Sequence, residues 1–135
     1  MVAIKIYKTS ILIFKDRQRY VMGDFRFRNR SAKGNPRQMV QLWAEKEMRN
    51  LLKIHRAYTN GFPLRCPQPI VQKRNILVME FIGDAEYPAA RRKDAQIEDW
   101  PKVYEDVVIA MKVLYSECRL VHADLSEYNL LYWDG

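Results

Sequence analysis

Residues 120–133 read LVHADLSEYNLLYW, and this stretch decides the expected fold. His122 is followed by Asp124 two positions later and by Asn129 five positions after that, between two apolar runs. This H-x-D-x-x-x-x-N spacing is typical of a phosphoryl-transfer loop, in which the Asp meets the substrate hydroxyl and the Asn reaches a magnesium ion on the nucleotide phosphates. Two buried flanking strands are expected to hold such a loop still. The alternative for this octet alone is a polar turn between two short strands.

A second motif, Val2-Ala3-Ile4-Lys5, stands at the other end of the chain. It matches the V-A-I-K strand signature, whose Lys contacts the α- and β-phosphates of a nucleotide and pairs with a Glu on a helix. For this motif alone, an ordinary strand that ends in a solvated Lys is the alternative. The two motifs in this order, with a helix between them, favour a nucleotide-dependent phosphotransferase.

The helix between the motifs is expected to begin at Asn35-Pro36 and to run to about Tyr58, because Asn caps helices well and Pro suits the first helical position. Its apolar stripe comprises Val40, Trp43, Met48, Leu51 and Leu52. Glu47 lies inside that stripe. A half-buried carboxylate needs a cationic partner, and Lys5 is the candidate. The alternative is a boundary Glu that reaches solvent.

The remaining elements follow from hydrophobic period and turn residues. Strands are expected at residues 2–7, 69–72 and 76–81, with a turn at 73–75. Residues 84–96 look irregular. A second helix is expected after Asp99 as its cap, with Pro101 in the first turn. Its periodic residues predict a well-buried helix and are Trp100, Val103, Tyr104, Val107, Val108, Met111, Leu114, Tyr115 and Cys118.

Composition indicates one folded domain without a membrane span. The chain has 135 residues, of which 48% are hydrophobic, and no apolar run approaches the roughly 20 residues that a membrane helix needs. No basic stretch followed by an apolar stretch opens the chain, so no secretory signal is expected. Cys66 and Cys118 are too few for a disulfide framework, which favours a reducing compartment. We therefore expect a protein of a reducing compartment with no membrane partner.

The net charge of +7 is concentrated in one segment. Residues 15–37 are rich in Lys and Arg, and aromatic residues alternate with the charges, as in Phe25-Arg26-Phe27-Arg28. A basic surface with interleaved aromatics suits a polyanion, RNA above all. The alternative is a solvated charged loop.

Several longer motifs carry a family resemblance. HADLSEYN, YKTSILIFKDR, KGNPR, WAEKEMRNL, CPQPI and LVMEFIG resemble the RIO-type atypical serine/threonine protein kinases, the first subfamily before the third, over residues 2–135. The resemblance implies an α+β, protein-kinase-like fold that is partial here. Residues 1–82 would form the N-lobe part with the basic insert 15–37. Residues 83–135 would begin the C-lobe and contain the catalytic loop 122–129.

The resemblance also assigns site residues for two cofactors, ATP and Mg²⁺. Asp124 resembles the catalytic Asp, and Asn129 resembles a magnesium ligand. The residues that resemble the nucleotide-binding positions are Lys5 at the phosphates, Glu47 as its partner, Met79 at the back of the pocket, and Glu80 and Ile82, whose backbone groups meet the adenine.

The resemblance implies an ATP-dependent protein kinase or ATPase that acts in the cytoplasm, in maturation of the small ribosomal subunit, with precursor particles and ribosomal RNA as partners. No strands that would carry a glycine-containing phosphate loop stand before Val2, and the chain ends at Gly135, before a second metal-binding Asp. We therefore expect a segment of the kinase domain that is inactive when isolated. Two alternatives remain, which are a non-catalytic module that binds RNA or pre-ribosomes and a small-molecule kinase of the aminoglycoside or choline type.

Overall fold

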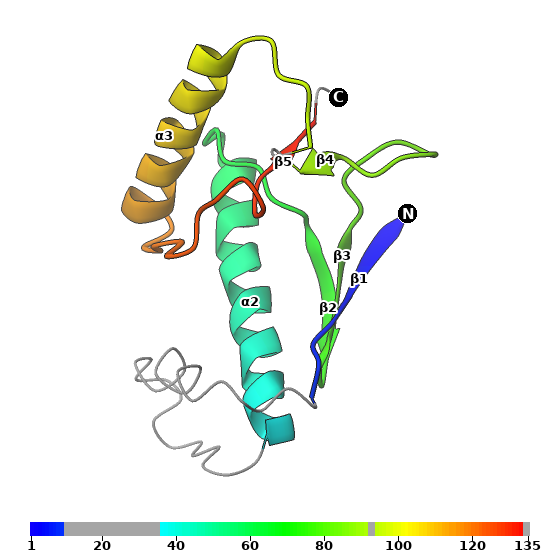
Figure 1. Ribbon diagram of the computed structural model, residues 1–135. Helices are drawn as coiled ribbons and strands as arrows, with labels where there is room; N and C mark the ends of the chain where they lie inside the picture. The colour runs from blue at the N-terminus through cyan, green and yellow to red at the C-terminus, as the bar shows by residue number, and fades with distance from the viewer. Residues whose placement is uncertain (10–35, 92–93, 134–135) are drawn as a thin grey trace.

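The computed structural model describes residues 1–9, 36–91 and 94–133 (Figure 1). The elements in order are β1 (Val2–Ile6), α2 (Pro36–Thr59), β2 (Pro69–Lys73), β3 (Ile76–Glu80), β4 (Ala90–Arg91), α3 (Trp100–Ser116) and β5 (Leu131–Tyr132). The expected α+β class is confirmed. Nearly all of the basic insert 15–37 lies outside the described residues. Neither described helix is long and apolar enough to cross a bilayer.

The three longer strands form an antiparallel sheet in the order β1-β3-β2. Ala3 lies opposite Met79, and Lys5 lies opposite Leu77. Because side chains alternate along a strand and opposed residues share a face, these four side chains lie on the same side of the sheet. Leu77 is fully buried on this side, where α2 covers the sheet (Figure 1). The register therefore turns Lys5 toward α2.

Helix α2 lies between the sheet and α3 (Figure 1). Near its C-terminal end, Ala57 packs with Leu64 and with Val113, Leu114 and Cys118 in the main hydrophobic cluster. The predicted apolar stripe of α2 is correct at Val40 but wrong at Leu52, which is exposed, while Leu42 and Ala44 are buried instead. The helix meets neighbours on more than one side, so a single stripe does not describe its covered surface.

Helix α3 begins as expected but is less buried than expected. Asp99 caps it, and its side chain accepts a hydrogen bond of 2.9 Å from the Lys102 backbone N–H. Only Val113 and Leu114 of the helix are buried, whereas Tyr104 is 73% exposed and Tyr115 is 68% exposed. The prediction of a well-buried helix is therefore wrong for the described part of the chain, because α3 contributes one face to the cluster with α2 and leaves the other in solvent.

Residues 84–96, expected to be irregular, contain the two-residue strand β4, and a tight antiparallel turn joins Gly83 to Pro88. Gly83 has φ +147°, and a Cβ placed there would lie 2.4 Å from the Tyr87 carbonyl oxygen. Only glycine fits this close approach. Asp84 supports the same turn by accepting from the N–H groups of Glu86 at 2.8 Å and Tyr87 at 2.7 Å. These bonds lower the pKa of the Asp84 carboxyl.

Candidate functional site

Lys5 and Glu47 form the ion pair that the sequence predicts. The Lys5 Nζ lies 2.7 Å from Glu47 Oε1 and 2.8 Å from Glu47 Oε2, which joins β1 to α2. The Lys5 side chain is 48% exposed and the Glu47 side chain is 33% exposed. The pair is therefore open to a solvent-borne ligand on the Lys5 side. Coulomb attraction across a partly solvated pair is modest, so its main effect is to orient the ammonium group.

Tyr7 contacts both members of this pair, which sequence reasoning did not foresee. Its hydroxyl donates a short hydrogen bond to Glu47 Oε2, and its ring centre lies 5.1 Å from Lys5 Nζ. Burial, followed by the hydrogen bond and the charge of Glu47, raises the pKa of the Tyr7 phenol far above its ordinary value. The phenol therefore remains a donor at any physiological pH. The two-residue alternation of β1, which sets Lys5 and Tyr7 on one side, could have revealed this contact.

The loop at residues 122–129, predicted to be catalytic, brings Asp124 and Asn129 together. The Asn129 Nδ2 donates to the Asp124 carbonyl oxygen at 2.7 Å and lies 3.1 Å from Asp124 Oδ2. Ser126 closes the loop by accepting from the Asn129 backbone N–H at 3.0 Å. Ala123, just before Asp124, has φ 63°, a left-handed conformation that costs a non-glycine residue about 1 kcal/mol. Backbone strain of this kind tends to occur at functional sites.

The expectation of two buried strands around this loop is wrong. Residues 117–121, immediately before His122, form no strand, and Val121 is 75% exposed. After Asn129, the short strand β5 pairs with β4, with Leu131 opposite Arg91 and Tyr132 opposite Ala90. The loop is instead held by its own hydrogen bonds and by this short ladder.

The residues expected to meet the adenine lie at the end of β3 and just beyond it. Met79 is opposite Ala3, on the same face as Lys5. Gln68, from the connection before β2, fixes Glu80 twice, by accepting from its N–H at 2.8 Å and donating to its Oε2 at 3.0 Å. The Ile82 carbonyl accepts from the Ala89 N–H at 2.9 Å. These contacts fix the backbone where an adenine is predicted to bind, and the binding itself stays a prediction.

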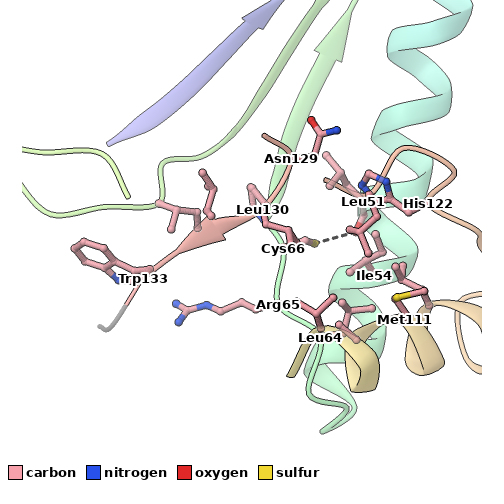
Figure 2. Close-up of a pocket in the computed structure, with 17 residues that line it drawn as sticks. Leu51, Ile54, Leu64, Arg65, Cys66, Met111, His122, Asn129, Leu130 and Trp133 are labelled. Carbon is pink, nitrogen blue, oxygen red and sulfur yellow. Dashed lines mark hydrogen bonds between the residues drawn. The ribbon is translucent and has the colours of Figure 1, made fainter. Parts of the chain in front are cut away.

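An apolar pocket of about 430 Å³ lies beside the catalytic loop (Figure 2). Its lining includes Leu51 and Ile54 of α2, Met111 of α3, Cys66, and the loop residues His122 and Asn129. Leu51 follows Glu47 by one helical turn. The pocket therefore lies between the loop that carries Asn129 and the part of α2 that begins one helical turn beyond Glu47.

Cys66 lines this pocket as an unreactive thiol. Its Sγ lies 3.6 Å from the Leu51 carbonyl oxygen (Figure 2). Burial, followed by the neighbouring Cys118 and Glu80, raises the pKa of the Cys66 thiol to about 12. A thiol held protonated is a poor nucleophile and metal ligand.

This raised pKa predicts a pH effect on stability. The unfolded thiol ionises near its ordinary pKa of 9.0, while the folded thiol ionises near 12. Its contribution to the free energy of unfolding is therefore complete below pH 9 and is lost as the pH rises toward 12. Between pH 8 and pH 10, the free energy of unfolding measured in urea should fall more for the unaltered chain than for Cys66→Ser. The difference between the two slopes should not exceed the value for one proton, about 1.4 kcal/mol per pH unit. Equal slopes would contradict the raised pKa.

Asp124 and Asn129 also fit a magnesium ion by donor chemistry. A carboxylate and an amide oxygen are the hard ligands that Mg²⁺ prefers, and Mg²⁺ usually takes few protein ligands beside phosphates and water. Within residues 1–9, 36–91 and 94–133, no group of three or more His, Cys, Asp or Glu side chains could hold a metal. A metal at this loop would therefore need ligands beyond these side chains, such as nucleotide oxygens.

Comparison with known proteins places these residues in a family. The RIO domain model matches residues 1–135. The serine/threonine-protein kinase rio1 of Dictyostelium discoideum is 54% identical over 133 residues, which cover 97% of this chain and 22% of that protein. In Homo sapiens, the serine/threonine-protein kinase RIO1 is 51% identical over 135 residues, covering 98% of this chain and 23% of that protein. The human serine/threonine-protein kinase RIO3 is 46% identical over 135 residues, which cover 98% of this chain and 25% of that protein.

The chain thus spans 22% to 25% of the length of these relatives. The resemblance read from the sequence is confirmed, with higher identity to the two relatives named rio1 or RIO1 than to RIO3. This chain belongs to the RIO domain family, and the relatives it matches are named serine/threonine-protein kinases.

Proposed function

We propose that this chain supplies nucleotide- and metal-binding residues of an ATP-dependent atypical serine/threonine protein kinase or ATPase. The observation that carries the proposal is the pairing of two groups, Lys5 with Glu47 and Asp124 with Asn129. The first presents a cation to phosphates, and the second presents a carboxylate beside a metal-binding amide. The relatives are protein kinases by name, so they offer no support for the small-molecule kinase alternative.

In this proposal each residue has a separate task. The Lys5 ammonium binds the α- and β-phosphates of ATP, and Glu47 orients it. Met79, Glu80 and Ile82 line the adenine side. The Asp124 carboxylate accepts the proton of the attacking hydroxyl or water. Asn129 would hold Mg²⁺, which would supply positive charge beside the phosphates.

The test is a chimera in which residues 1–135 replace the matching segment of the Dictyostelium discoideum relative. Magnesium-dependent ATP turnover by this chimera, within about tenfold of the parent enzyme, is the expected result, because positioning and electrostatics supply most of the catalysis in phosphoryl transfer. A folded chimera without turnover would contradict the proposal and favour the non-catalytic, RNA-binding alternative. The isolated 135-residue chain is expected to bind ATP without measurable turnover.

We further propose that the enzyme acts in the cytoplasm on precursors of the small ribosomal subunit, with ribosomal RNA as a contact of the basic insert. The support is the family resemblance and the composition of residues 15–37. In the chimera, replacing Arg26, Arg28 and Arg30 together by Ala should weaken RNA binding. The dependence of affinity on salt should also become shallower, by the amount expected for the loss of about three phosphate contacts. Binding titrations at several salt concentrations measure both. An unchanged affinity and slope would identify the insert as a solvated loop.

A further inference from the structure

Tyr7 links the sheet to α2 through the Glu47 carboxylate. Its hydroxyl donates to Glu47 Oε2, the oxygen that also lies 2.8 Å from Lys5 Nζ. Glu47 Oε1 lies 2.7 Å from the same ammonium. Both carboxylate oxygens are therefore engaged, and one of them by a donor that carries no charge.

The backbone of Tyr7 is also fixed, by two hydrogen bonds to Asn75. Its N–H donates to the Asn75 carbonyl oxygen at 2.9 Å, and its carbonyl accepts from Asn75 Nδ2 at 3.0 Å. Asn75 belongs to the turn that joins β2 to β3. Tyr7 follows the end of β1, yet these two bonds fix it to the turn of the neighbouring hairpin. The phenol therefore has a fixed position from which it holds Glu47.

We propose that Tyr7 is a positioning residue of the nucleotide site, which keeps the Glu47 carboxylate in place while the Lys5 ammonium binds phosphate. This inference rests on the proposed ATP site. A phosphate group competes with Glu47 for the Lys5 ammonium, and a carboxylate that is two-thirds buried loses stabilisation when its cation turns away. The Tyr7 hydroxyl offsets that loss and keeps Glu47 from following the ammonium or turning to solvent.

The decisive variant is Tyr7→Phe, which keeps the ring beside Lys5 and removes only the hydroxyl. Calorimetric titration of the 135-residue chain with ATP and Mg²⁺ should give an affinity about 3- to 10-fold lower for Tyr7→Phe, because the lost bond is to a charged but partly exposed carboxylate. Tyr115→Phe is the matched control, since it removes the same hydroxyl from the exposed side of α3 and should bind like the unaltered chain.

A double variant separates positioning from a general loss of packing. If Tyr7 acts through Glu47, adding Tyr7→Phe to Glu47→Ala, which removes the acceptor, should lower ATP affinity by less than about twofold further. A merely structural role would give the same loss in both backgrounds, and that result would overturn the inference.

The outcomes also separate this inference from the proposed function. If Lys5→Ala weakens ATP binding while Tyr7→Phe binds like the unaltered chain, the role of Tyr7 is wrong and the nucleotide site stands. The proposed nucleotide site is wrong if the unaltered chain does not bind ATP saturably, or if Lys5→Ala binds ATP as tightly as the unaltered chain. In either case the role of Tyr7 is wrong as well.

Discussion

Replacement of Asp124 by alanine in the chimera should lower the rate of phosphoryl transfer by about 10²- to 10⁴-fold while ATP affinity changes by less than about twofold. The reason is that a carboxylate acting on the attacking hydroxyl or water contributes mainly in the transition state. Asp124 is exposed in the loop and lies beside the Asn129 amide, where it can meet such a group. Single-turnover rates at saturating ATP, together with calorimetric affinities, measure the two quantities separately.

Glu127 provides the control for this experiment. It is an exposed carboxylate in the same loop, and no catalytic role is assigned to it. Glu127→Ala should keep the rate within about threefold, since solvent and salt screen the charge of an exposed side chain. If Asp124→Ala instead loses ATP binding as severely as turnover, Asp124 is a structural part of the nucleotide pocket and its catalytic role is wrong.

Replacement of Lys5 by alanine should reduce ATP affinity by at least about tenfold, because a charge-assisted contact to phosphate is lost. The free energy of unfolding should fall by only about 1 kcal/mol or less, since both partners of the ion pair are partly solvated. Calorimetry and urea unfolding of the 135-residue chain measure these two effects. A large loss of stability with unchanged ATP affinity would show that the Lys5–Glu47 pair stabilises the fold and does not bind ATP.

Lys8 is the matched control for Lys5. It is an exposed lysine three residues further along, beyond the end of β1. Lys8→Ala removes the same charge from the same region, so both variants change the net charge equally. An equal loss of ATP affinity in both would indicate general attraction of ATP to a basic surface rather than a site at Lys5.

The sequence could predict the contacts that follow from strand and helix periods. Lys5 faces α2 because of the two-residue period of β1, and Glu47 stands out as a carboxylate within an apolar helical stripe. The same period applied to Tyr7 would have extended the cluster by one residue. The spacing from Asp124 to Asn129 also predicted their convergence, because a short loop can direct both side chains to one point.

Contacts that depend on non-local packing could not be predicted in the same way. The period of α3 identifies an apolar stripe but does not reveal that Tyr104 and Tyr115 remain in solvent. The pairing of β4 with β5 involves two residues in each strand, which is too short for a periodic signal. One of the two bonds between Glu80 and Gln68 joins backbone groups, which carry no residue-specific signal, and the other joins the Gln68 N–H to the Glu80 carboxylate.

Labelling with an ATP acyl phosphate tests most directly whether ATP binds with its phosphates at Lys5. The reactive carbonyl of this reagent transfers an acyl group to a lysine amine held beside the phosphates, and mass spectrometry of the labelled 135-residue chain identifies that lysine. We predict that Lys5 is labelled, that excess ATP with Mg²⁺ suppresses this labelling, and that Lys8 is labelled weakly and without competition. Labelling of Lys8 equal to that of Lys5, or labelling of Lys5 that excess ATP does not reduce, would contradict the account.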